Sequence, residues 1–205
     1  MQSRDGKYFL RRWQKGAGGT EENVLEAEIH YVMGSGNAAR SYLHRTPQGR
    51  LAELPVAWYS EKGGYFAMSP GYDRPDHQGF RRKISTDCMF CHNAYPANRD
   101  VTPASEPLFA EKLPEGIDCQ RCHGPGRAHV EAATANQKDA ARAAIVNPAR
   151  LSADRSFEVC MQCHLETTSL PLPNSLVRFS RGAFSYDVGK PLVDFTLHFD
   201  HGVGR

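Results

Sequence analysis

Short runs that mix apolar and polar residues fill the first third of the chain. Between residues 8 and 68 the runs are "KYFLRRW", "NVLEAEIHYV", "ARSYLHRT", "LAELPVAWYS" and "GYFAMS", and turn-forming segments such as "GAGG", "GSGN" and "EKGG" separate them. Short runs rich in β-branched and aromatic residues favour strands. The pattern therefore predicts a β-meander, which we assign to a module spanning residues 1–75.

Residues 76–205 contain fewer strand-like runs and two segments that favour helix. Residues 127–145, "RAHVEAATANQKDAARAAI", are rich in good helix formers, and "NPAR" ends this predicted helix. A second helix is predicted to begin after Ser152, a good N-cap residue, with Asp154 in its first turn. Long polar and proline-rich stretches connect these segments. The sequence thus predicts an α+β fold with a mostly helical and irregular second region.

Composition and charge exclude some classes of function. The chain has 205 residues, 40% of them hydrophobic and 23% charged, as in an ordinary globular protein. A net charge of +2 and the lack of any Lys/Arg-rich stretch argue against nucleic acid as a partner. No apolar run is long enough to cross a bilayer, and "MQSRDGKYFLRRW" lacks the apolar segment of a secretory signal.

All six cysteines lie in three copies of one pattern, C-x-x-C-H. The copies are "CMFCH" (residues 88–92), "CQRCH" (119–123) and "CMQCH" (160–164), here called the first, second and third motif. A chain of this composition would contain on the order of 0.01 copies by chance. Disulfides and structural zinc are two possible chemistries for paired cysteines, but neither explains the histidine that closes every copy.

Covalent c-type haem explains both cysteines, their spacing and the histidine. On one helical turn, two cysteines three residues apart share a face and can reach the two vinyl groups of one porphyrin. The histidine that follows supplies the proximal nitrogen to the iron. We therefore expect three haem c groups, with porphyrins filling the centre of residues 76–205 as a haem-packed cytochrome c region. The predicted attachment residues are Cys88, Cys91, His92, Cys119, Cys122, His123, Cys160, Cys163 and His164.

Six further histidines are candidates for the second axial ligand of each iron. His129 is the strongest, because it follows His123 by six residues in "CHGPGRAHV", where glycine and proline turn the chain. His30, His44 and His201 are also predicted ligands, and each could instead be a hydrogen-bonded histidine without iron. Bis-histidine ligation follows from these assignments. Weaker candidates are His77, His198, Met33 and Met68.

The motifs and the phrases between them resemble a known family. "HYVMGSGNAARSYL", "LPVAWY", "SPGYD", "CHGPGRAHV", "IVNPARL" and "CMQCHLET" are similar to multihaem c-type cytochromes of the superfamily that includes the tetrahaem cytochrome of ammonia-oxidising bacteria. The resemblance is closer to the haem modules of exported proteins with tetratricopeptide repeats. It implies electron transfer and a periplasmic or extracellular location. In that family a further motif lies upstream and repeats follow downstream, so we expect this chain to be a fragment of a longer one.

The leading hypothesis is electron transfer through three bis-histidine haems, as a carrier or as a subunit of a larger redox assembly. Expected partners are other redox proteins or haem subunits, including copies of the chain itself. The alternative is a multihaem oxidoreductase with one open haem that acts on a small nitrogen or sulfur oxyanion. A haem-stapled structural module is a third class. The arginines considered for an open distal pocket are Arg40, Arg45, Arg81 and Arg82.

Overall fold

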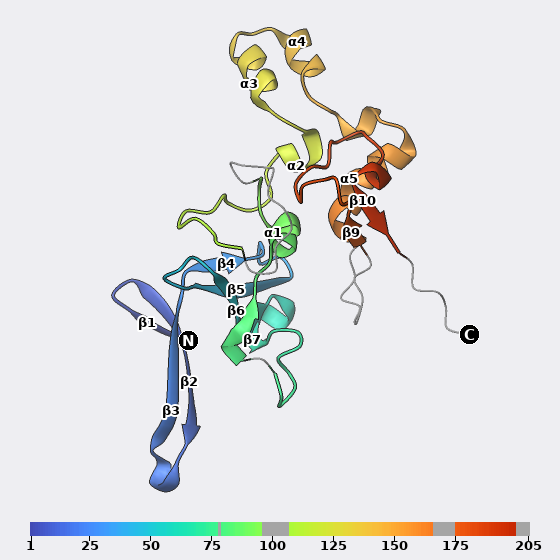
Figure 1. Ribbon diagram of the computed structural model, residues 1–205. Coiled ribbons are helices and arrows are strands. Elements are labelled where there is room, and N and C mark those ends of the chain that lie inside the picture. The colour runs from blue at the N-terminus through green and yellow to red at the C-terminus, as the bar shows by residue number, and fades with distance from the viewer. Residues whose placement is uncertain (78, 96–106, 166–174, 200–205) are drawn as a thin grey trace, which may run out of the picture. The chain divides into compact units, whose positions relative to one another are not determined.

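The computed structural model describes residues 1–77, 79–95, 107–165 and 175–199. The chain forms two compact units (Figure 1). Unit 1 comprises Met1–Ser85 and Ser105–Leu113, and unit 2 comprises Thr86–Ala104 and Pro114–Arg205. All three motifs therefore belong to unit 2, whereas His30, His44 and His77 belong to unit 1.

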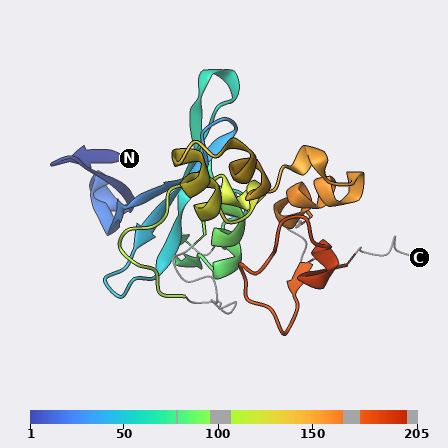
Figure 2. The same cartoon turned by 90° about the horizontal axis from the view of Figure 1, so that it is seen from above.

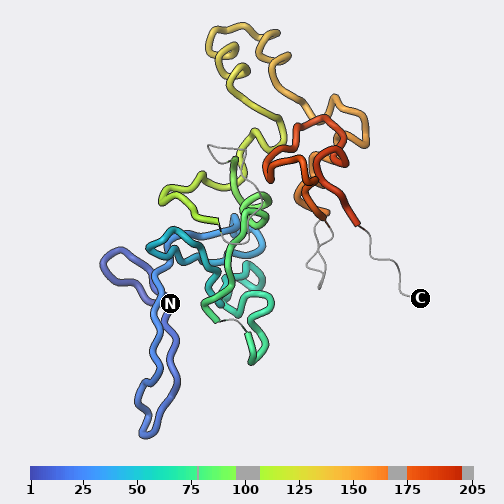
Figure 3. Tube along the Cα trace, viewed as in Figure 1, coloured from blue at the N-terminus to red at the C-terminus, as the bar shows by residue number. Residues whose placement is uncertain are grey.

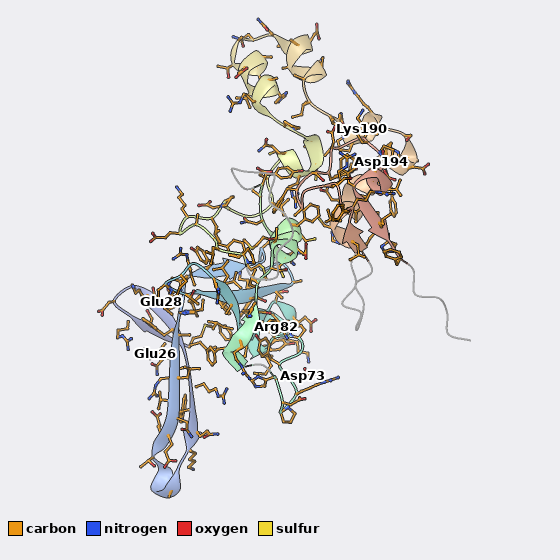
Figure 4. The ribbon with its side chains drawn as sticks, in the orientation of Figure 1. Glu26, Glu28, Asp73, Arg82, Lys190 and Asp194 are labelled. Carbon is orange, nitrogen blue, oxygen red and sulfur yellow. The ribbon has the colours of Figure 1, made fainter. Side chains whose placement is uncertain are left out.

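The first sheet of unit 1 is a three-stranded antiparallel ribbon in the order β1-β2-β3. Its strands are β1 (Gln2–Arg4), β2 (Lys7–Lys15) and β3 (Glu21–Ile29). Cross-strand ion pairs join Arg4 to Glu26 (2.8 Å) and Lys7 to Glu28 (3.0 Å), and both glutamates lie along β3 (Figure 4). Figure 3 shows β2 and β3 as one long paired ribbon. Most residues of β2 and β3 are exposed, and the end of the ribbon near Leu10 and Ala27 contributes to a core.

The second sheet of unit 1 has five antiparallel strands and holds most of the buried residues of this unit. The order is β4 (Tyr31–Met33), β5 (Ala39–Arg45), β6 (Leu51–Tyr59) and β7 (Tyr65–Met68), and β8 (Arg82–Lys83) also pairs with β6. Short 3-10 turns connect some elements: Ala17–Gly19, Glu61–Gly63 and Gly79–Arg81. The central strand β6 is the most buried, and Leu54 packs with Leu10 and Ala27.

A segment that follows the first motif in sequence returns to unit 1. The N–H group of Phe109 donates to the carbonyl of Gly49 (2.8 Å), and the Phe109 carbonyl accepts from Nη2 of Arg45 (3.1 Å). Gly49 has φ = 89°, and a Cβ atom there would lie 2.9 Å from the Phe109 carbonyl oxygen. Both the backbone conformation and the close approach therefore require glycine at position 49.

Unit 2 contains five helices and one two-stranded antiparallel sheet within its described residues. They are α1 (Thr86–His92), α2 (Gln120–His123), α3 (Arg127–Thr134), α4 (Lys138–Ala143), α5 (Ala153–His164), β9 (Ser175–Val177) and β10 (Thr196–His198), with 3-10 turns at Pro148–Arg150 and Leu192–Asp194. The predicted start of the last helix is confirmed. Oγ of Ser152 accepts a hydrogen bond from the N–H group of Arg155 (3.4 Å), and Asp154 lies in the first turn.

The single helix predicted over residues 127–145 is wrong, because the segment folds as the helical hairpin of α3 and α4 (Figure 1, Figure 2). Asn136 interrupts it with φ = 59°, a left-handed conformation that asparagine tolerates better than most residues. The alanine-rich composition correctly indicates helix, but it does not reveal that "TANQ" interrupts the helix.

The predicted fold class, a β-meander followed by a haem-packed, mostly helical and irregular region, is wrong. The described residues form a mixed structure of three antiparallel sheets and five helices, in which helix and strand each account for 29%. The N-terminal runs do form strands, but the run "NVLEAEIHYV" is divided at His30 between two separate sheets. The third sheet, the antiparallel pair of β9 and β10, lies in the region that was expected to be helical and irregular.

The core of unit 2 consists of its own side chains, which is the physical reason that the haem-packed description fails. Tyr186 and Phe195 meet edge to face, with ring centroids 5.5 Å apart. The buried cluster is Val159, Tyr186, Val188, Leu192 and Phe195. The aliphatic and aromatic side chains of α5 and of residues 183–195 therefore supply the apolar burial that was assigned to porphyrin.

None of the helices in the described residues has both the length and the apolar composition needed to cross a membrane.

Candidate functional site

The histidine of each motif is the last residue of a helix. α1 ends at His92, α2 at His123 and α5 at His164. In the first and third motifs, both cysteines lie on the helix that ends at the motif histidine. In the second motif, Cys119 is the N-cap of that helix and Cys122 lies on it. In this arrangement the cysteines and the histidine share one helix face, as attachment to a porphyrin with axial ligation requires.

None of the six cysteines, all of which the structure describes, forms a disulfide, and cysteines of all three motifs come near one another in unit 2. Cys119, Cys122 and Cys160 are exposed, and the other three are partly buried. The thiol of Cys91 donates to the backbone carbonyl of Cys163 over 3.9 Å. A hydrogen bond from Cys91 lowers the pKa of the Cys163 thiol to about 7, although burial opposes this shift. Burial raises the pKa of the Cys122 thiol, and the neighbouring cysteines add to the effect.

The second spacer residue of the second motif contacts the corresponding residues of the other two motifs. These residues are Phe90 in the first motif, Arg121 in the second and Gln162 in the third. The guanidinium carbon of Arg121 lies 4.2 Å from the centroid of the Phe90 ring. Gln162 donates its side-chain amide to the backbone carbonyl of Arg121 over 2.8 Å. These contacts tie the three motif helices together within unit 2.

The second motif borders a cavity of about 760 Å³, a volume in the range of cofactor sites. Cys119, His123 and His129 all line it, together with Val130, Ile145 and Val146. Nδ1 of His123 donates to the carbonyl of Val146 (2.8 Å), and Nδ1 of His129 donates to the carbonyl of Ala141 (2.8 Å). A carbonyl can only accept, so the neutral form of each ring leaves Nε2 without a proton. Such an Nε2 is available to a metal, and the carbonyl fixes the ring orientation.

The two histidines predicted as ligands in unit 1 lie side by side. His30 and His44 meet edge to face, with centroids 5.1 Å apart. Nδ1 of His44 lies 2.8 Å from the carbonyl of Glu28, which leaves its Nε2 available in the same way. Nδ1 of His30 instead accepts from the N–H group of Arg45 (3.1 Å) and also lies 3.2 Å from the Glu28 carbonyl. His44 therefore fits a ligand role better than His30.

The same question, which ring nitrogen carries the proton, applies to the weaker histidine candidates. Nδ1 of His77 accepts a hydrogen bond from the N–H group of Gly79 (2.9 Å), so a neutral His77 carries its proton on Nε2 and does not offer that atom to iron. His198 lies at the exposed end of β10. His201 lies outside the described residues.

The arginines considered for an open distal pocket belong to unit 1, and three of them have contacts there. Arg82 pairs with Glu53 (2.8 Å) and lies over the ring of Tyr72 (4.0 Å). Arg45 donates to Phe109, and Arg40 lies over Trp58 (5.2 Å). Like Arg81, these residues belong to the strands and turns around β6 and not to the unit that carries the motifs.

Among the residues that the structure describes, no three His, Cys, Asp or Glu side chains gather as a metal-binding cluster. A haem iron takes only one or two ligands from the protein, so such a cluster is not what c-type haem requires. A scan of protein-family models, a search of curated proteins and a search of solved structures each find no match to this chain.

The spacer residues are the part of the site that the sequence reasoning missed. Among the described residues of unit 2, Arg121 has the most deeply buried large side chain, yet the sequence reasoning gave it no role. A charged residue inside one of three otherwise neutral spacers was the available signal. Nothing in the sequence could indicate that Phe90, Tyr95 and Phe184 surround it, because all three are far from Arg121 along the chain.

Proposed function

We propose that this protein transfers electrons through three covalently bound c-type haems, as a carrier or as a subunit of a larger redox assembly. The single observation that carries the proposal is the state of the two histidines at the cavity of the second motif. Both His123 and His129 donate Nδ1–H to a backbone carbonyl and keep Nε2 for another partner. Exposed thiols beside such a histidine are the donor set that haem c requires.

The residues of the chain have separate roles in this proposal. The cysteine pairs attach the porphyrins, and His92, His123 and His164 bind the irons from one side. His129 is the best supported ligand for the other side, followed by His44, and His30 and His201 complete the set of candidates. The bound haem supplies reversible one-electron chemistry, while the protein sets its potential through ligands, burial and nearby charge.

Location and partners follow from this chemistry. We infer a periplasmic or extracellular location and partners that are themselves redox proteins or haem subunits, with self-association as one form of such an assembly. The motif helices offer exposed cysteines, so attached haems would lie close to the surface of unit 2. Haem edges near a surface suit electron exchange between proteins.

The experiment is to express the chain in an exporting host with a cytochrome c attachment system and to weigh the denatured product. We expect the added mass of three haems and a low-spin absorption spectrum. The variant Cys119→Ala/Cys122→Ala serves as the matched control and should carry two haems. A product without added mass would contradict the proposal. Three haems with a high-spin ferric band and ready binding of CO would instead support the oxidoreductase alternative.

A further inference from the structure

A buried positive charge in unit 2 has no counter-ion among the described residues. The Arg121 side chain is 1% exposed, and none of Nε, Nη1 and Nη2 has a hydrogen-bond partner in that part of the chain. A buried guanidinium with five unpaired N–H groups is strongly disfavoured. Something must therefore bind these donors in the functional protein.

Aromatic rings contact Arg121 but do not satisfy its N–H groups. The centroids of the Phe90, Tyr95 and Phe184 rings lie 4.2, 4.6 and 5.5 Å from the guanidinium carbon. The negative face of a ring attracts the cation. The N–H bonds, however, lie in the plane of the guanidinium and point to its rim. The rings thus contact the guanidinium, while its N–H groups remain without an acceptor among the described residues.

The described carboxylates of unit 2 whose partners are known bind groups other than Arg121. Glu158 pairs with Arg155 and also accepts from the N–H group of Leu192. Asp118 accepts from the backbone and side chain of Gln120. Burial alone raises the pKa of Asp87, without a contribution from Arg121. An acceptor from outside the described residues would satisfy these donors, and a carboxylate matches the planar guanidinium with two parallel hydrogen bonds.

We propose that Arg121 binds a propionate carboxylate of a haem attached at the first or third motif. The assignment rests on the proposed function and adds a residue that tunes one haem. Side chains two positions apart on a helix point to opposite sides, so Arg121 points away from the haem held by Cys119 and Cys122. It contacts Phe90 of the first motif, and its carbonyl bonds to Gln162 of the third.

The test uses the haem-loaded chain and compares Arg121→Met, Arg121→Lys and the control Arg142→Met. Arg142 has a 71% exposed side chain in unit 2, so its removal changes the net charge equally without touching the buried site. A cation beside a haem disfavours the ferric state. We expect Arg121→Met to lower the midpoint potential of one haem, Arg121→Lys to lower it less, and Arg142→Met to leave all three unchanged.

Further measurements separate the possible failures. A loaded chain with three haems whose potentials are the same in Arg121→Met and wild type would overturn the inference but not the proposed function. A chain without haem would contradict both. If added formate at constant ionic strength shifts the wild-type potentials but not those of Arg121→Met, the site takes a free anion and the propionate assignment fails. If Arg121→Met does not fold, the potentials of Arg121→Lys decide the matter, and values equal to those of the wild type would overturn the inference.

Discussion

Gln162 on α5 donates its side-chain amide to the backbone carbonyl of Arg121 on α2 over 2.8 Å and to the carbonyl of Val159 over 2.7 Å. One amide group thus joins the second and third motif helices. Because the contact is partly buried, water does not fully replace it when it is lost.

Replacement of Gln162 by Met should destabilise unit 2 by about 1 kcal/mol, because both carbonyls lose a donor while the volume is kept. Urea unfolding monitored by circular dichroism would measure the change. Gln137→Met makes the same change at an exposed position whose side chain caps nothing. This control should stay within about 0.5 kcal/mol of the wild type. Equal losses of unfolding free energy in the two variants would show that the hydrogen bond from Gln162 to the Arg121 carbonyl contributes nothing to stability.

Tyr72 should make unit 1 sensitive to alkaline pH. Its side chain is 1% exposed, and burial raises its pKa to about 12, while its hydroxyl donates to the carbonyl of Glu53 (2.9 Å). The folded state therefore holds this proton more tightly than the unfolded chain, whose tyrosine pKa is about 10. The contribution to stability is complete below pH 10 and is lost between about pH 10 and 12.

The measurement is the free energy of unfolding at several pH values from 8 to 11.5, for wild type and Tyr72→Phe. The variant should be about 1 kcal/mol less stable at pH 8, because the Glu53 carbonyl loses its donor. It should then lose less stability than the wild type as the pH rises. Tyr186, whose pKa burial also raises to about 12, remains in both proteins and accounts for a residual loss. Parallel pH profiles would refute the role of Tyr72.

The tautomers of the histidines predict which of them bind iron. In the haem-loaded protein, His129→Ala should convert one haem partly to the high-spin form and allow it to bind CO, because Nε2 of His129 is removed. Added imidazole should restore the low-spin spectrum. His77→Ala should change neither property, because Nδ1 of His77 already accepts from Gly79. An unchanged spectrum in His129→Ala would remove His129 from the ligand set.

Asn136 should tolerate glycine but not alanine. Its φ of 59° falls in the left-handed region, where a Cβ atom costs about 1–2 kcal/mol for most residues. We expect Asn136→Ala to lower the free energy of unfolding by about 1 kcal/mol and Asn136→Gly to leave it nearly unchanged. Thermal unfolding of the two variants would measure the difference. An Asn136→Ala protein as stable as Asn136→Gly would show that the hairpin relaxes into one continuous helix.

The sequence allowed local structure to be predicted well and long-range structure poorly. The strands over residues 7–68 and the N-cap at Ser152 follow from propensity and turn chemistry within a few residues. The division of one strand run at His30 and the break at Asn136 depend on a few backbone angles, which composition does not encode. The core around Tyr186 and Phe195 depends on contacts between segments far apart in sequence, and it overturned the haem-packed description.

The candidate site also combines local features, which the sequence predicts, with long-range features, which it does not. C-x-x-C-H spacing is local, so the sequence alone identifies the three motifs as a candidate site, and the histidine of each motif ends a helix. Arg121 was missed because its burial involves rings that lie far from it in sequence, at Phe90, Tyr95 and Phe184. The tautomers that separate His129 from His77 depend on the single backbone group that each Nδ1 meets.

The return of the chain to unit 1 has a consequence for how the first motif is held. The N–H group of Ile84 donates to the carbonyl of Leu51 (3.0 Å), and that of Phe109 donates to the carbonyl of Gly49 (2.8 Å). The stretch that carries the first motif therefore leaves and re-enters unit 1 at positions two residues apart. If a protease nicked this stretch, both new ends would remain anchored to the same sheet. The two fragments would stay together under native conditions and separate only in denaturant.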